Sequence, residues 1–456
     1  MKSKALLSLF LTLYCLTTSA KVFNVMAPLI IGDPNNLSSE YSKAELRKFQ
    51  DQLNEIKSLG ATGVSTDIWW GLIEKEDNKF NWQYYQVLSD LIIDSGLKWV
   101  PILSFHQCGG NVGDTCDVPI PNWLWQKYGA SAMSKSEQGN FSKEYLSVWS
   151  THKAINEFYE VMGSFKMNFS HKMKDIYEIN VSLGPAGELR YPSYNSHDNG
   201  SGYPTRGALQ AYSELAVESF RNYVRNKYSN IDTVNFMWGF NLSSFKEVAP
   251  PNPFFFFPAQ EQHTNYGKDF YNWYSKSLRE HGKRILGAAI DTFRSEAHIQ
   301  LGFKVPGIHW RVAPGADRLA ELNAGLISTD QDIFSDKTGH GYNRIIGIIN
   351  ELRKEKDFHQ LNFHFTCLEM NNLEGPTNAQ SYAKALVFWV AQEAQRQGVR
   401  ILGENALAGT LHDHKAWDNI ADALYFGNYD GVTFLRMGTI LSSQLAKDRF
   451  RQMTKQ

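Results

Sequence analysis

Eight short apolar runs recur along this chain, and longer stretches, several with helix-like periodicity, separate them. The runs span residues 23–29, 63–68, 98–105, 176–183, 303–310, 362–368, 400–403 and 431–435. Each has the length and composition of a buried β-strand. Because strands that alternate with helices favour a parallel sheet, eight of them predict an α/β fold, the (β/α)8 barrel.

The stretches between the runs support this alternation. Residues 44–59 place five apolar side chains on one helical stripe, and Gly60 ends it. The five are Leu46, Phe49, Leu53, Ile56 and Leu59. Ser42 and Glu45 have the spacing of a capping box at the start of this helix. Further helices are expected at 82–95, 207–227, 343–354 and 379–397.

The spacing of the runs is uneven after the third and fourth strands. Residues 107–150 and 189–300 are too long for simple strand–helix units, so we expect large insertions there. Loops that follow the C-terminal ends of barrel strands surround the active face of that fold. The insertions therefore predict a deep pocket, which admits the end of a polymer and not its middle.

Two of the apolar runs lead into glutamates in glycine-bounded segments. Glu188 lies in GELRYPSY after the fourth run, and Glu404 lies in GENAL after the seventh. A single glutamate after an apolar run is more often a solvated surface acid. A pair of acids at the ends of barrel strands is, however, what cleavage of a glycosidic bond requires. The sequence therefore indicates a sugar hydrolase.

The segments around these glutamates carry a family resemblance. The blocks FHQCGGNVGD at 105–114 and GELRYP at 187–192 resemble the signature pair of the β-amylases, glycoside hydrolase family fourteen. Five supporting blocks occur in the family's order, so that the resemblance covers about residues 24 to 438. They are TDIWWG at 66–71, KVPGIHW at 304–310, FTCLEM at 365–370, GENAL at 403–407 and GVTFLR at 431–436.

The resemblance implies an exo-acting, inverting hydrolase that releases β-maltose from the non-reducing ends of α-1,4-glucans. It assigns the general acid to Glu188 and the general base to Glu404, which spacing alone does not distinguish. Other positions match residues that bind the sugar chain in the family. They are Asp67, His106 and Asp114 at the inner end, Lys304, His309 and Trp310 on the reducing side of the cut, Thr366 in an inner loop that contacts bound sugar, and Asn405 and Arg436 near the base.

Two alternatives remain open. One is another two-carboxylate barrel glycosidase that retains the anomeric configuration, against which the glycine-rich segment 109–113 argues as a family-type lid. The other is a non-catalytic glucan-binding homologue. The presence of Glu188, Glu404, Asp114 and Thr366 argues against such degeneration.

The charge and the metal-binding residue types limit the possible partners. A formal net charge of −1 gives no electrostatic case for nucleic acid or an anionic membrane, and no protein partner is implied. The expected substrate is a neutral α-glucan, and no cofactor is required.

His106 and Cys108 lack a second close pair for zinc, so no metal ligands are assigned. The family resemblance implies calcium near residues 74–78 in bacterial relatives, but that segment appears one residue shorter here. With only Glu157 as an obvious acidic partner, calcium stays open.

The first twenty residues have the pattern of a secretory signal. Lys2 and Lys4 precede an apolar run at 5–16, and Ala20 ends a small-residue cleavage site. We expect a secreted or periplasmic protein with one catalytic domain at 21–456 and no starch-binding module after it. In an oxidising compartment, Cys108 and Cys116 bracket a loop short enough for a disulfide, while Cys367 reads as a buried thiol.

Overall fold

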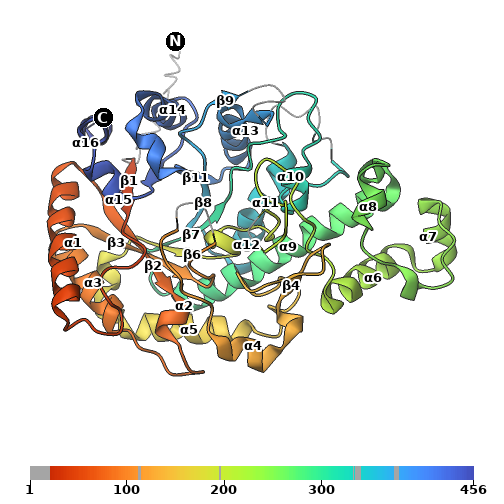
Figure 1. Cartoon of the computed structure of the whole chain (residues 1–456), viewed down its shortest axis with the longest axis horizontal. Helices are drawn as coiled ribbons and strands as arrows, with labels where there is room; N and C mark the ends of the chain where they lie inside the picture. Colours follow the sequence, from red (N-terminus) through yellow and green to blue (C-terminus); the bar gives the residue numbers. More distant parts are fainter. Residues whose placement is uncertain are drawn as a thin grey trace, which may run out of the picture.

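The computed structural model describes residues 21–110, 114–194, 197–331, 333, 340–373 and 379–455. Eight parallel strands form a closed barrel in the order β1-β12-β11-β8-β7-β6-β3-β2 (Figure 1). They are β1 (Val22–Met26), β2 (Gly63–Trp69), β3 (Lys98–Ser104), β6 (Glu178–Val181), β7 (Gln300–Val305), β8 (Leu361–Phe365), β11 (Arg400–Glu404) and β12 (Gly431–Phe434). The predicted (β/α)8 barrel is therefore confirmed.

Several strand assignments shift at their ends, most clearly those of β7 and β8. The sequence predicts the fifth strand at 303–310, but β7 spans Gln300–Val305, so only the first two residues of the KVPGIHW block lie in the barrel. Pro306 explains this end, because proline has no N–H to donate to a neighbouring strand. Cys367 likewise lies two residues beyond β8, with a φ of 68°, although it is buried as expected.

Helices surround the barrel, and each connection between successive barrel strands contains at least one of them (Figure 1). The principal ones are α1 (Glu40–Ser58), α3 (Gln83–Asp94), α5 (Ile155–Asn168), α9 (Asn265–Phe293), α11 (Asn343–Ile346), α12 (Ile348–Lys356), α13 (Ala383–Arg396), α14 (His414–Tyr425), α15 (Met437–Leu441) and α16 (Gln444–Thr454). The predicted capping box of Ser42 and Glu45 is wrong, because Ser39 caps α1 by accepting from the Ser42 N–H. The helix predicted at 343–354 is two helices that meet at Gly347.

Both long insertions are present. The one after β3 holds α4 (Asn122–Tyr128), a small sheet of β4 (Ser134–Lys135) with β5 (Phe141–Ser142), and α5. The one after β6 holds α6 (Glu214–Tyr228), α7 (Ile231–Trp238), α8 (Pro253–Phe256) and α9, and its first three helices project as a lobe (Figure 1). Stacked aromatic rings join the two insertions, with ring centroids 5.4 Å apart for Trp149 and Tyr191 and 3.9 Å for Tyr191 and Tyr274.

Besides short 3-10 turns, the described chain has two more short helices and one more small sheet. They are α2 (Trp70–Ile73), α10 (Leu319–Asn323) and the pair β9 (Asn372–Leu373) with β10 (Ser381–Tyr382).

The predicted disulfide between Cys108 and Cys116 is present, and Cys367 is a free, buried cysteine. Among the described residues, no helix combines the length and the apolar character that a membrane span requires. Residues 1–20, with the predicted signal, lie outside the described part of the chain.

Candidate active site

A cavity of about 530 Å³ opens at the C-terminal end of the barrel. All eight barrel strands contribute a lining residue at or near the point where they end. These residues are Met26, Trp69, His106, Val181, Lys304, Thr366, Glu404 and Leu435, and Glu188 joins them from the turn that follows β6. Side chains from inside the barrel, including Ser65, Asn180 and His364, also line it. Because small barrels are filled by side chains, the cavity is closed at its inner end.

The barrel interior beneath the cavity is polar, and His364 of this interior lines the cavity itself. His364 Nε2 lies 2.6 Å from Glu178 Oε1, which also accepts a hydrogen bond of 3.0 Å from Asn362 Nδ2. All three side chains are buried, and an alanine Cβ at Gly302 would lie 2.4 Å from the same Glu178 oxygen. The apolar character of the runs gave no indication of this polar interior, because it depends on how residues of the three neighbouring strands β6, β7 and β8 meet.

A tight turn presents Glu188 to the cavity. The short 3-10 turn Pro185–Gly187 precedes it, and Gly187 has a φ of 78°, which favours glycine. A Cβ on Gly187 would also approach His106 Cε1 to 3.2 Å. After the turn, the Leu189 N–H donates to the Lys304 carbonyl at 2.7 Å, so the acid is anchored to β7. The glycine before the glutamate is therefore needed for both conformation and space.

Arg190 and Tyr194 hold the Glu188 carboxyl. Arg190 Nε donates to Glu188 Oε2 at 2.9 Å, and the Arg190 guanidinium lies 4.2 Å from the centre of the Tyr194 ring. Tyr194 is also hydrogen-bonded to Glu188. Burial raises the pKa of Glu188 above its ordinary value, although Arg190 and Lys304 act in the opposite direction. Such a carboxyl is suited to carry a proton.

Glu404 ends β11 and has a different partner. Its Oε1 accepts a hydrogen bond of 2.7 Å from Lys304 Nζ, and only 8% of its side-chain surface is exposed. The backbone of Lys304 in β7 also forms a parallel bridge with the backbone of Glu188. One lysine therefore contacts the segments that carry both acids. In the barrel order, β7 and β8 separate β6 from β11, so the two glutamates do not lie on adjacent strands.

The segment after Glu404 is held by a buried carboxylate that the sequence did not single out. Glu369 Oε1 accepts from the backbone N–H groups of Ala406 at 3.0 Å and Leu407 at 2.8 Å. Burial raises the pKa of Glu369 to about 7, against the effect of these two hydrogen bonds. Ala406 and Leu407 line the cavity, so Glu369 positions part of its wall.

Five of the residues that the resemblance assigns to sugar binding line the cavity besides Lys304. They are Asp67, His106, Asp114, Thr366 and Arg436. Asp67 accepts from Ser104 Oγ at 2.9 Å, and burial raises its pKa while Arg436 lowers it. Burial, with Lys304 as the next cause, lowers the pKa of His106 to about 3, so this imidazole is neutral at ordinary pH.

Three predicted binding residues do not line the cavity. Asn405 is buried and connects the ends of β11 and β12, since its Oδ1 accepts from the Leu435 N–H at 2.8 Å and its Nδ2 donates to the Leu435 carbonyl. His309 Nδ1 lies 2.6 Å from Ser381 Oγ. Trp310 Nε1 donates to the Thr205 carbonyl at 2.8 Å. Direct sugar contacts of these three residues stay predictions.

The loop closed by the disulfide reaches the cavity through Asp114. The Gly109 N–H donates to Asp114 Oδ2 at 3.2 Å, inside the loop that Cys108 and Cys116 close. The lid predicted at 109–113 lies partly outside the described residues, because only Gly109 and Gly110 are described. Its closure stays a prediction.

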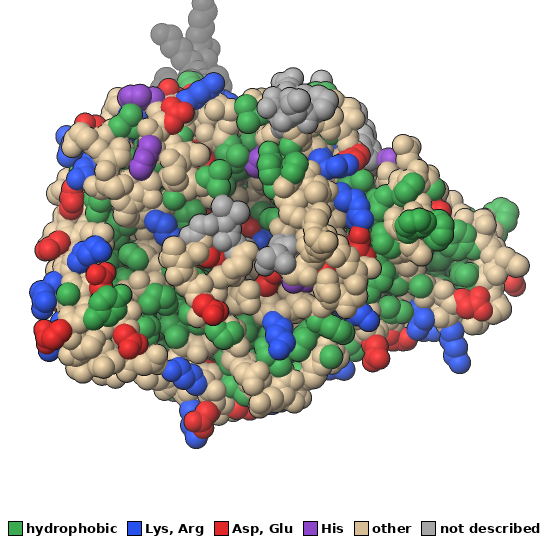
Figure 2. All heavy atoms as spheres, in the orientation of Figure 1, with side chains coloured by type: hydrophobic (Ala, Val, Ile, Leu, Met, Phe, Trp, Pro, Cys, Tyr) green, Lys and Arg blue, Asp and Glu red, His purple; other side chains and the backbone are tan. Residues whose placement is uncertain are grey.

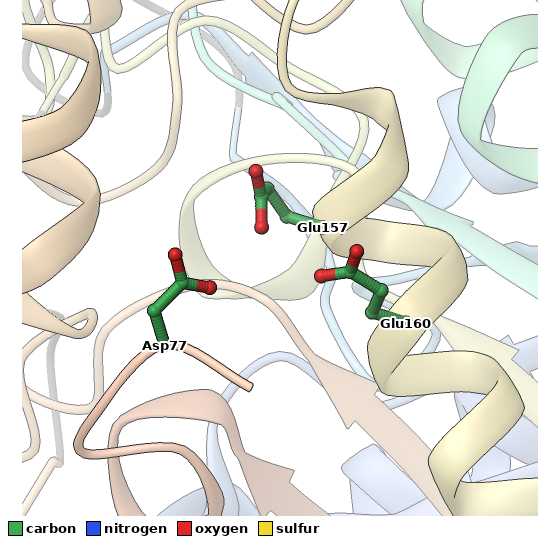
Figure 3. Close-up of side chains that lie close together, drawn as sticks. All are labelled: Asp77, Glu157 and Glu160. Atoms are coloured by element: carbon green, nitrogen blue, oxygen red, sulfur yellow. The ribbon is translucent and has the colours of Figure 1, made fainter. Parts of the chain in front are cut away.

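The calcium expectation can be compared with an acidic cluster away from the cavity. Asp77, Glu157 and Glu160 each offer an oxygen, and these atoms lie within 4.8 Å of one another (Figure 3). Glu160 was not foreseen from the sequence. The cluster as it stands does not fit calcium, because Lys127 Nζ lies 2.8 Å from Asp77 Oδ2 and 2.9 Å from Glu157 Oε1. A second cation in that space would be repelled.

The surface around the barrel mouth carries mixed charge. Figure 2 shows acidic and basic side chains interspersed over this face, with no extended region of one sign. This distribution agrees with the net charge of −1. It suits a neutral substrate better than a polyanion.

The sequence and the fold were compared with those of known proteins. The sequence model of glycosyl hydrolase family 14 matches residues 24–453. A thermophilic beta-amylase from Thermoanaerobacterium thermosulfurigenes is 38% identical over 405 residues, which are 88% of this chain and 69% of that protein. A beta-amylase from Cytobacillus firmus is 35% identical over 449 residues, 94% of this chain and 90% of that protein. The solved catalytic domain of a beta-amylase from Paenibacillus polymyxa aligns with a TM-score of 0.80 at 34% identity, covering 95% of this chain and 98% of that chain.

Proposed function

Because this chain belongs to glycosyl hydrolase family 14, we propose that it hydrolyses α-1,4-glucans from their non-reducing ends and releases β-maltose. The proposed substrates are starch, glycogen and maltodextrins. The observation that carries the proposal is the pair Glu188 and Glu404, which line one cavity and contact different cations. Beta-amylases from several bacteria are similar to this chain over most of its length.

The surroundings of the two carboxyls support a division of roles. A general acid must carry a proton, and burial raises the pKa of Glu188 in that direction. Glu404 is held by Lys304 Nζ and serves as the base that activates water. In an inverting glycosidase, the acid protonates the leaving oxygen while the base activates a water on the opposite face of the sugar. The position of β7 and β8 between β6 and β11 in the barrel order supports a separation of the two carboxyls that leaves room for that water.

Exo action follows from a cavity that is closed at one end. Interior side chains of the barrel form its floor, and a glucan can enter only from the barrel mouth. The neutral His106 and the carboxyl of Asp67 supply hydrogen-bonding groups to the hydroxyls of the terminal sugars. A bound chain end then places its second glycosidic bond between the two glutamates, which gives a disaccharide product.

Digestion of soluble starch, followed by viscosity and by product chromatography, tests this proposal. We expect maltose to appear early while the viscosity falls slowly, because each cut shortens a chain only from its end. Rapid loss of viscosity with little maltose would mean an endo enzyme. Release of no reducing sugar would favour a non-catalytic glucan-binding homologue.

We also propose that residues 1–20 direct export and that residues 21–456 form one catalytic domain. The signal-like pattern and the disulfide between Cys108 and Cys116 support export, because disulfides persist in oxidising compartments. The mass of the exported protein should correspond to cleavage after Ala20. Export without cleavage, or two alkylatable thiols at Cys108 and Cys116 in the native protein, would contradict this proposal.

A further inference from the structure

The acidic cluster of Asp77, Glu157 and Glu160 has no part in the proposed reaction, because none of its members lines the cavity. We propose that Lys127 is the cation of this cluster in place of a divalent metal ion. We further infer that removal of its ammonium turns the cluster into a calcium site.

Two segments far apart in the sequence bring the acids together. Asp77 lies in the loop that follows α2, and Glu157 and Glu160 lie one turn apart on α5. Figure 3 shows the three carboxylates converging on one space between this loop and the helix. Carboxylate oxygens are the ligands that calcium prefers, so the arrangement has the right chemistry for that ion.

Lys127 of α4 fills this space from a third segment. Its Nζ donates to Asp77 Oδ2 at 2.8 Å and lies 2.9 Å from Glu157 Oε1. The neighbouring Tyr128 hydroxyl also donates to Glu157 Oε1. The hydrogen bond to Asp77 is the largest of the effects that raise the pKa of Lys127, so the amine stays charged. The ammonium therefore links α4 to both acid-bearing segments, as a bound metal ion would.

One ammonium leaves part of the donor set unused. Glu157 is 3% exposed, and its Oε2 has no hydrogen-bond partner among the described residues. Burial, and next the charge of Glu157, raises the pKa of Glu160. Lys127 thus compensates Asp77 and one oxygen of Glu157, whereas the neighbouring Glu157 and Glu160 carboxyls, which interact with each other, are left with less positive charge than a divalent ion would supply.

Thermal unfolding of the full chain in EDTA and in about 10 mM CaCl2 tests the inference, since weak protein calcium sites have Kd values of roughly 10⁻⁴–10⁻³ M. The wild type should unfold at the same temperature in both buffers. Lys127→Met should unfold at a lower temperature in EDTA and regain several degrees in calcium. Lys79→Met is the matched control, because Lys79 pairs with exposed Glu76 outside the cluster. Its melting temperature should not depend on calcium.

Terbium luminescence gives a second readout that does not depend on stability. The Trp123 ring lies 5.3 Å from Lys127 Nζ, close enough to sensitise a terbium ion in the cluster. Emission should appear in Lys127→Met, stay absent in the wild type and in Lys127→Arg, and be lost from Lys127→Met when Glu160→Gln is added.

Three outcomes would overturn the inference. The first is a wild-type protein that loses several degrees in EDTA and regains them in calcium. The second is a folded Lys127→Met protein with neither a calcium-dependent melting temperature nor terbium emission. The third is terbium emission from the wild type or from Lys127→Arg. This measurement tests the role of Lys127 even if Lys127→Met does not fold in either buffer.

Discussion

Glu188 and Glu404 share one cavity, yet the chain holds them by different means. Glu188 sits on a tight turn after β6 and contacts Arg190 and Tyr194, both from its own segment. Glu404 ends β11 and contacts Lys304 from a different strand. The partners of Glu188 are thus local in sequence, whereas the partner of Glu404 comes from β7, which lies two positions away in the barrel order. The setting of Glu188 therefore depends on local chain conformation, and the setting of Glu404 depends on tertiary packing.

Substitution of either glutamate should have the largest effect. Glu188→Gln removes the proton donor and Glu404→Gln removes the base, and each contribution is worth roughly 10²–10⁴-fold in turnover. Because the two groups act in one step, the double variant should lose little more than the worse single variant. Initial rates of maltose release measure this, with circular dichroism to confirm the fold. Near-normal turnover of Glu404→Gln would show that the base is a different group.

Lys304→Met should come next, because it removes the cation of Glu404 while keeping a side chain of similar length. Loss of a hydrogen bond to a charged group costs about 1.5–3 kcal/mol, or roughly 10–150-fold. We expect the loss in kcat, measured on maltodextrin. Lys384→Met, which removes an ammonium that pairs with Asp422 on the outer helices, is the control. An unchanged kcat in Lys304→Met would mean that Glu404 needs no cation.

Arg190→Gln should change the pH profile more than the rate. Arg190 lowers the pKa of Glu188, so its loss should raise that pKa further. Because the acid is active while protonated, the alkaline limb of kcat/KM should move to higher pH. Arg190→Lys keeps the charge and should move the limb less. A limb that moves to lower pH in Arg190→Gln would contradict the assignment of the acid to Glu188.

The sequence predicts the barrel and the two glutamates well, but it does not predict the long-range contacts that hold them. The eight strands, both insertions, the disulfide and both glutamates follow from local patterns and motifs. Arg190 was visible in the GELRYPSY block, but its contact with Glu188 depends on the turn at Gly187. Pairings such as Lys304 with Glu404 lie 100 residues apart, and no local pattern encodes them. Glu160 lies one turn from Glu157 on α5, but its place in the acidic cluster shows only when the loop that carries Asp77 packs against that helix.

The smallest effect is expected at Glu369, which positions the segment after Glu404. Glu369→Leu leaves the N–H groups of Ala406 and Leu407 without acceptors, at a cost of about 1–3 kcal/mol in the free energy of unfolding. Glu369→Gln keeps one carbonyl oxygen and should restore most of that stability. Because the segment lines the cavity, KM should rise in Glu369→Leu more than in Glu369→Gln. Equal KM values in both variants would show that Glu369 acts only in folding.

The anomeric form of the first product tests the division of roles most directly. If Glu188 protonates the leaving oxygen while Glu404 activates water on the opposite face, an α-linked glucan must yield maltose with inverted configuration. Time-resolved proton NMR of fresh digests should then show β-maltose first, followed by slow mutarotation. Initial release of α-maltose would contradict the account, because it would require one carboxyl to act as a nucleophile.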